Sequence, residues 1–231
     1  MDFFLKSFIA AFHLIGSLDA ELLTTVQVTL STSGMATLLA ALAGIPAGFL
    51  VAYNNLPGKR ILITLLNTLQ ALPTVVIGLF VYMLISRRGI FGPLGLLYSQ
   101  KAMVIGQCIL ILPLIASLTI AAVSRVDERY RKTAKTLGAN GWQTALVVLR
   151  EARFAIAAAV IAAFARVISE IGISMMLGGN IKGFTRTMTT AMALEYDKGS
   201  FTLALALGLV LLMLSLGVNV VFNLIQGKSG R

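Results

Sequence analysis

Arg166 and Glu170 are the ionisable residues most suited to a role in function, because they interrupt the otherwise charge-free segment 154–181. A spacing of four residues places them on one helix face, where they can form an ion pair. Charged residues within a membrane helix face the bundle interior or a water-filled path. The pair therefore either fixes the packing of helices or helps to line or gate a path for an anion.

Residues for covalent or metal chemistry are scarce. His13 is the only histidine and Cys108 the only cysteine, so an internal disulfide and a His/Cys metal site are not expected. The run Gly227-Lys228-Ser229 is similar to the end of a phosphate-binding loop, but that motif needs a glycine where Phe222 stands. We predict no catalytic residue, no metal and no cofactor bound by this chain.

The composition is that of an integral membrane protein. Hydrophobic residues make up 58% of the chain and charged residues 12%, and the mean hydropathy is +0.90, whereas soluble domains have about 25% charged residues. The net charge of +10 could attract nucleic acid. In a membrane protein, however, basic residues gather on the cytoplasmic side, and we expect no nucleic-acid binding.

Charge-free runs predict five membrane-spanning helices, since about 20 apolar residues cross a bilayer. Pro46, Pro73 and Pro113 lie in the first three, where they should kink or loosen the helix, or else serve ordinary packing. The predicted spans are residues 24–53, 61–86, 102–123, 154–177 and 201–226.

The first 20 residues differ from the rest. Phe4, Phe8 and Phe12 recur at helical spacing beside polar residues, which is typical of an amphipathic helix in the membrane interface. A short sixth transmembrane helix is the alternative. Residues 1–20 are thus predicted as an interfacial helix and residues 21–227 as the transmembrane domain.

The distribution of basic residues predicts the orientation. With the amino terminus outside, the inner segments 54–60, 125–153 and the tail hold 2, 7 and 2 Lys/Arg, against 7 in the outer segments. The positive-inside rule then favours a multi-pass protein of the cell membrane with an external amino terminus and a cytoplasmic carboxyl terminus.

The polar loop 124–153 has the pattern of two helices joined by a turn. Gly138 can end the first helix in the left-handed conformation, and Asn140 can cap the second. Trp142, Leu146 and Leu149 then share one face, which could seat in a groove of a partner protein.

This loop resembles the cytoplasmic coupling loop of ABC-importer permeases. The family pattern is Glu-Ala-Ala, three residues, Gly, nine residues, Ile, one residue, Leu-Pro. Lys132-Thr133-Ala134, Gly138 and Val148 occupy the corresponding positions, with Lys132 in place of the acid and Arg150-Glu151 in place of Leu-Pro. The resemblance implies that an ATPase is coupled through Thr133, Ala134, Leu137, Gly138, Ala139, Trp142, Val148 and Leu149.

The segment 165–181 is similar to the Glu-Phe-Gly…Gly-Asn-Ile-Pro region of permeases for molybdate, tungstate or sulfate. Its run from Ser174 to Asn180 is most similar to tungstate permeases. We predict that Arg166, Glu170, Ser174 and Asn180 lie on the translocation path or gate. Asn180 and residues 185–187 could contact the anion or its binding protein, or form an ordinary polar loop.

The resemblance implies an all-α integral membrane protein with the ABC-importer permease-like (MetI-like) fold. It further implies a homodimer, a separate ABC ATPase that binds ATP-Mg, and a periplasmic or extracellular oxyanion-binding protein. The expected function is alternating-access import of tungstate, with molybdate or sulfate as alternatives and no covalent chemistry. A passive anion channel, which would conduct without ATP, is the rival function; a membrane enzyme would need paired acids that the spans lack.

Overall fold

The computed structural model describes residues 2–54 and 56–227, and these residues form helices, turns and loops without a β-strand. The predicted all-α class is confirmed. Lys228 and Ser229, on which the phosphate-loop comparison rested, lie outside the described residues. The helices are α1 (Asp2–Gly16), α2 (Ala20–Tyr53), α3 (Lys59–Gln70), α4 (Thr74–Ile85), the 3₁₀ turn η1 (Gly92–Leu94), α5 (Gln100–Ser124), α6 (Glu128–Thr136), α7 (Gly141–Ile168), α8 (Gly172–Gly178), α9 (Met188–Asp197) and α10 (Phe201–Gly227).

Within residues 2–54 and 56–227, three helices, α2, α5 and α10, are long and apolar enough to cross a membrane by themselves. Two further spans consist of two helices each: α3 and α4 meet at 95°, and α7 and α8 meet at 62°. Five spans result when each bent pair counts as one, in agreement with the predicted number. The kink predicted at Pro73 within span 61–86 is present as a full break, whereas the break within span 154–177 was not predicted.

Pro73 explains the first break. It caps α4 with an extended backbone, φ −60° and ψ 133°, and a proline disfavours the helical conformation in the residue before it. Pro46 and Pro113 behave differently, because α2 and α5 continue through them as helices.

The second break lies directly against the first. A Cβ added to Gly172, the first residue of α8, would lie 2.9 Å from Thr74 Oγ1 at the start of α4. Only a residue without a side chain allows this approach. The two broken spans therefore touch where each of them changes direction.

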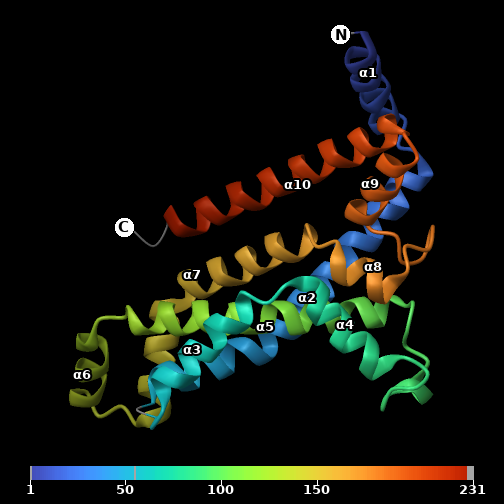
Figure 1. Ribbon diagram of the computed structural model, residues 1–231. Coiled ribbons are helices and arrows are strands. Elements are labelled where there is room, and N and C mark those ends of the chain that lie inside the picture. The colour runs from blue at the N-terminus through green and yellow to red at the C-terminus, as the bar shows by residue number, and fades with distance from the viewer. Residues whose placement is uncertain (1, 55, 228–231) are drawn as a thin grey trace.

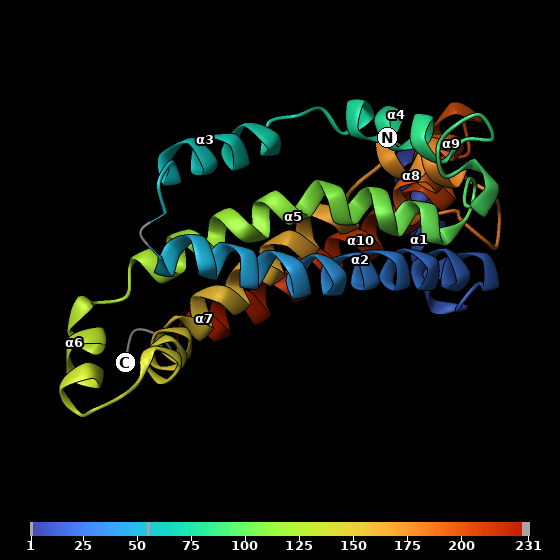
Figure 2. The ribbon, with the colours of Figure 1, turned by 90° about the horizontal axis from the view of Figure 1, so that it is seen from below.

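Two groups of helices lie at opposite ends of the molecule (Figures 1 and 2). The short helix α6 projects at one end, which we call the α6 end. The helices α1, α8 and α9 gather at the other, which we call the α9 end. The helices α2 and α5 run side by side between them.

Glycines of α2 allow this close contact with α5. A Cβ at Gly48 would lie 2.5 Å from the carbonyl oxygen of Ala116, and one at Gly44 would lie 3.1 Å from the Ile115 side chain. Small residues at helix interfaces in membranes let backbones approach and pack. The seam between α2 and α5 is thus specified by backbone shape as well as by hydrophobicity.

Gly48→Ala is expected to lower stability by about 1–3 kcal/mol, because the new methyl group would force the α2 and α5 backbones apart. Gly34→Ala is the matched control on the same helix, since nothing lies within 4 Å of its added Cβ. The midpoint of thermal unfolding in detergent measures both. Equal midpoints for the two variants would contradict the packing described for α2 and α5.

The amino-terminal helix α1 packs against α10. Ala11 is fully buried in a cluster with Leu22 and Leu207, while Ile9 and Phe12 are exposed. One face of α1 is therefore anchored to the bundle. Its position at the membrane interface, and the division of the chain at residue 20, stay predictions.

Candidate functional site

The loop at the α6 end has the predicted helix–turn–helix form. Gly138 takes the left-handed conformation with φ +82° directly after α6. Asn140 caps α7 through a capping box, in which Asn140 Oδ1 accepts from the Gln143 N–H at 2.8 Å and Gln143 Oε1 accepts from the Asn140 N–H at 2.9 Å. Both ends of the turn are thereby fixed.

The coupling residues implied by the sequence divide into exposed and buried ones. Leu137 is 81% exposed and Trp142 73% exposed, unusually high values for large apolar side chains. Val148 is fully buried in the cluster that joins α2, α5 and α7, and Leu149 packs against that cluster. Thr133 and Gly138 are exposed, Ala139 is half-buried and Ala134 is buried.

Tyr53, at the end of α2, ties this loop to the bundle. The Arg131 guanidinium lies 4.3 Å from the centre of its ring, and the Tyr53 hydroxyl donates to the carbonyl of Gly141 at 3.3 Å. A cation over an aromatic ring is a favourable contact. The contacts connect both helices of the loop to the end of a membrane span.

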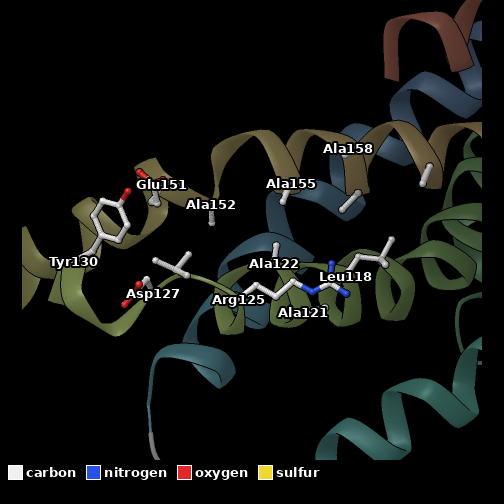
Figure 3. A pocket seen from close by; sticks show the side chains of 13 residues that line it. Leu118, Ala121, Ala122, Arg125, Asp127, Tyr130, Glu151, Ala152, Ala155 and Ala158 are labelled. Carbon is white, nitrogen blue, oxygen red and sulfur yellow. The ribbon is translucent and has the colours of Figure 1, made fainter. Parts of the chain in front are cut away.

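A cleft of about 580 Å³ opens between α5 and α7 next to α6 (Figure 3). The α7 wall consists of small residues, and Arg125 extends along the cleft beside Leu118 (Figure 3). At its mouth the Tyr130 hydroxyl donates to Glu151, and this hydrogen bond raises the pKa of Tyr130. The lining residues are Leu118, Ala121, Ala122, Arg125, Val126, Asp127, Tyr130, Glu151, Ala152, Ala155, Ala158, Ala159 and Ala162.

Arg166 and Glu170 form an ion pair at the break between α7 and α8. Arg166 Nη1 lies 3.3 Å from Glu170 Oε2, and the other carboxylate oxygen accepts from the Ile173 N–H at 3.3 Å. Thr189 Oγ1 donates to the Glu170 carbonyl at 2.8 Å. The Glu170 side chain is 3% exposed and that of Arg166 47%. Glu170 therefore joins α7, the first turn of α8 and the start of α9.

Ser174 is also predicted for the path, and it is fully buried against α5 in this conformation. Gln107 Nε2 donates to Ser174 Oγ at 3.3 Å, and Gln107 Oε1 has no hydrogen-bond partner among the described residues. A polar contact between membrane helices holds them in a defined register. Gln107 thus fixes α8 against α5.

Asn180 lies farther along, in the segment that connects α8 with α9. It has φ +51°, and its Nδ2 donates to the Thr190 carbonyl at 3.3 Å. Thr185 Oγ1 donates to the Gly178 carbonyl at 2.6 Å and accepts from the Ile181 N–H at 3.0 Å. This polar segment is therefore folded on itself at the α9 end.

The structure thus brings Arg166, Glu170 and Ser174 together around the two helix breaks, and places the residues predicted for coupling at the α6 end. Gln107, Tyr53 and Thr74 were missed by the sequence analysis. Gln107 carried a usable signal, because it is a lone amide within an apolar span. Nothing in the sequence indicated that Thr74 would meet the second break.

The family is shown by comparison with known sequences. The model of the family described as "Binding-protein-dependent transport system inner membrane component" matches residues 44–229. This chain belongs to that family. The resemblance to ABC-importer permeases, drawn from loop 124–153 and segment 165–181, is confirmed, and the permease is an α-helical membrane protein of that type.

Individual relatives refine the placement of the permease. It is 37% identical over 226 residues to the tungstate uptake system permease protein TupB of Peptoclostridium acidaminophilum, covering 98% of this chain and 99% of the relative. The molybdenum transport system permease protein ModB of Escherichia coli K12 is 29% identical over 72% of this chain and 76% of that protein. The predicted order of resemblance, tungstate permeases before molybdate permeases, is confirmed.

Solved structures confirm the fold. The inward-facing MetNI methionine ABC transporter contains a chain that superposes with a TM-score of 0.73 at 17% identity, covering 91% of this chain and 97% of that chain. The predicted MetI-like architecture is therefore correct.

Proposed function

We propose that this permease is the membrane subunit of an ATP-driven importer for an oxyanion, and that the oxyanion is tungstate. The observation that carries the substrate is the similarity over the full length to a tungstate uptake permease. The permease carries out no covalent chemistry in this proposal. Molybdate and sulfate are the alternative substrates.

A separate ABC ATPase, which binds ATP-Mg, docks at the α6 end. Leu137 and Trp142 are the anchors, because exposed aromatic and apolar side chains carry most of the energy of a helix-in-groove contact. Ala134 and Val148 are buried and support the shape of the loop from inside. Thr133, Gly138, Ala139 and Leu149 complete the contact or hold its backbone.

The permease works as a homodimer in this proposal. Arg166 is 47% exposed on one protomer although it belongs to a membrane span, and such a charge needs a protein or water surrounding. A second copy supplies that surrounding and closes a path. Ala162, which lines the cleft between α5 and α7, lies four residues before Arg166 on the same face of α7, so the cleft and the exposed guanidinium belong to one side of that helix.

Transport proceeds by alternating access. The helix α7 is continuous for 28 residues from Gly141 to Ile168, about 42 Å. It therefore carries any rotation of the docked ATPase directly to the Arg166–Glu170 pair. The breaks before α4 and α8 are the points where the bundle can bend. The cycle is driven by the different affinities of ATP for the two conformations.

The α6 end faces the cytoplasm and the α9 end faces outward, where a periplasmic or extracellular binding protein delivers the anion. Support comes from the excess of basic residues in loop 125–153. The described chain begins at the α9 end and α10 runs toward the α6 end (Figures 1 and 2). The amino terminus is then outside and the carboxyl terminus cytoplasmic.

The test is ATP hydrolysis by the permease reconstituted in liposomes with its ATPase and binding protein. Tungstate should stimulate hydrolysis at a lower concentration than molybdate or sulfate. Equal stimulation by molybdate would remove the tungstate assignment and keep the importer. A permease that neither binds an ATPase nor responds to any oxyanion would contradict the proposed function.

A further inference from the structure

The α9 end holds a carboxylate between two basic side chains. Glu21, in the first turn of α2, places Oε2 at 2.7 Å from Lys182 Nζ and Oε1 at 3.0 Å from Arg186 Nη1. Lys182 and Arg186 both belong to the segment between α8 and α9. Each basic group therefore holds one oxygen of the same anionic group.

Arg186 needs an anion at this position. Its side chain is 11% exposed, and its Nε has no hydrogen-bond partner among the described residues. A guanidinium removed from water is stable only with a compensating negative charge, and its planar fork suits carboxylates and oxyanions alike. The buried Arg186 guanidinium therefore favours a ligand with negatively charged oxygen atoms.

The neighbouring charges leave room for an added anion. Among the side chains that the structure describes, Glu195 is the other acid whose charge acts with Arg186, and it is already bound by Lys198 Nζ at 2.9 Å. This hydrogen bond is the main reason that the pKa of Glu195 is lowered despite its burial, and the charges of Lys198 and, more weakly, Arg186 act in the same direction. The cluster has three basic groups, Lys182, Arg186 and Lys198, for two acids. Without Glu21, two cations would face one another with no anion between them.

We propose that Lys182 and Arg186 form a binding site for a tetrahedral oxyanion, which the Glu21 carboxylate occupies in this conformation. The class of ligand rests on the proposed function. Two oxygens of such an anion can replace the two oxygens of Glu21 in the same charge-assisted contacts. The Glu21 carboxylate thus occupies the position that the oxyanion would take.

The site is accessible to an incoming anion. The Lys182 side chain is 64% exposed, whereas that of Glu21 is 27% exposed. An anion that arrives from solution can therefore contact Lys182 before it displaces Glu21. Displacement of Glu21 would also remove the two ion pairs between α2 and the segment that connects α8 with α9, and would leave the hydrogen bond from the Met188 N–H to Thr29 Oγ1 as a link between α2 and α9. Arrival of the anion is thereby connected to a loosening of the α9 end.

The test measures tungstate binding to the purified permease–ATPase complex without its binding protein, in a non-ionic detergent that contains no phosphate. Glu21→Gln removes the competing charge and should tighten binding about ten- to a hundredfold, the effect of one charge-assisted contact. Asp197→Asn, an exposed acid at the same end outside these ion pairs, is the matched control and should bind like the wild type. Glu21→Gln combined with Arg186→Gln should lose the gain.

The proposal is overturned if Glu21→Gln binds tungstate no more tightly than Asp197→Asn, or if the double variant binds as tightly as Glu21→Gln. Loss of tungstate binding on addition of phosphatidylglycerol would assign the site to lipid headgroups instead. Should Glu21→Gln fail to insert, Lys182→Gln alone must weaken wild-type binding about tenfold. When one of these contrary results is obtained but tungstate still stimulates ATP hydrolysis in the presence of the binding protein, the anion site is disproved and the proposed transport function stands.

Discussion

Glu170→Gln is expected to lower oxyanion uptake by at least about tenfold in a permease that still inserts and still binds its ATPase. Glutamine keeps an oxygen that can accept from the Ile173 N–H, but it loses the charge that pairs with Arg166. The cost in stability should be about 1–2 kcal/mol, below the roughly 3–5 kcal/mol of fully buried pairs, because Arg166 is 47% exposed. Uptake by proteoliposomes, normalised to inserted protein, measures the effect.

Asp197→Asn is the control for this change, since it removes a carboxylate from an exposed position away from the helix breaks. A purely structural ion pair would give a different result. In that case Glu170→Gln would lower the thermal midpoint, while uptake per inserted molecule would equal that of Asp197→Asn. That outcome would exclude a role of the pair in gating.

Trp142→Ala should weaken binding of the ATPase by about 2–4 kcal/mol, or roughly 30- to 1000-fold, as expected for an aromatic anchor. Trp142 is 73% exposed in the free permease, so its removal should leave the fold and the thermal midpoint unchanged. Binding of the purified ATPase to the permease in nanodiscs, measured over a range of concentrations, gives the change directly.

Ile90→Ala provides the comparison for Trp142→Ala. Ile90 is 79% exposed and lies in the segment between α4 and η1, so its loss removes a large apolar side chain elsewhere on the surface. It should bind the ATPase like the wild type. Equal affinities of the two variants would show that the ATPase does not dock on the first turn of α7.

The sequence predicted the parts of the fold that depend on local chemistry. The five apolar runs, the left-handed Gly138 and the Asn140 cap are set by hydropathy and by neighbours within a few residues, and each is present. The size of the bend in span 61–86 and the break in span 154–177 were not predicted, because hydropathy cannot distinguish a straight helix from a broken one. Pro73 marked the position, but its two companions, Pro46 and Pro113, are accommodated within helices.

The site depends on contacts between distant segments, and these could be predicted only in part. The pairing of Arg166 with Glu170 is local and followed from helical spacing. The approach of Gly172 to Thr74 and the hydrogen bond between Gln107 and Ser174 join residues that are far apart in the chain. The packing of α8 against α4 and α5 produces both contacts, and no feature of either segment alone specifies it.

ATP-dependent accumulation of tungstate inside liposomes is the most direct test of the central claim. The liposomes would contain the permease with its ATPase, and the binding protein would be added outside. The account predicts accumulation against a gradient that requires ATP and the binding protein and that fails in Trp142→Ala. Equilibration of tungstate across the membrane without ATP would contradict it, and would identify the permease as a passive anion channel.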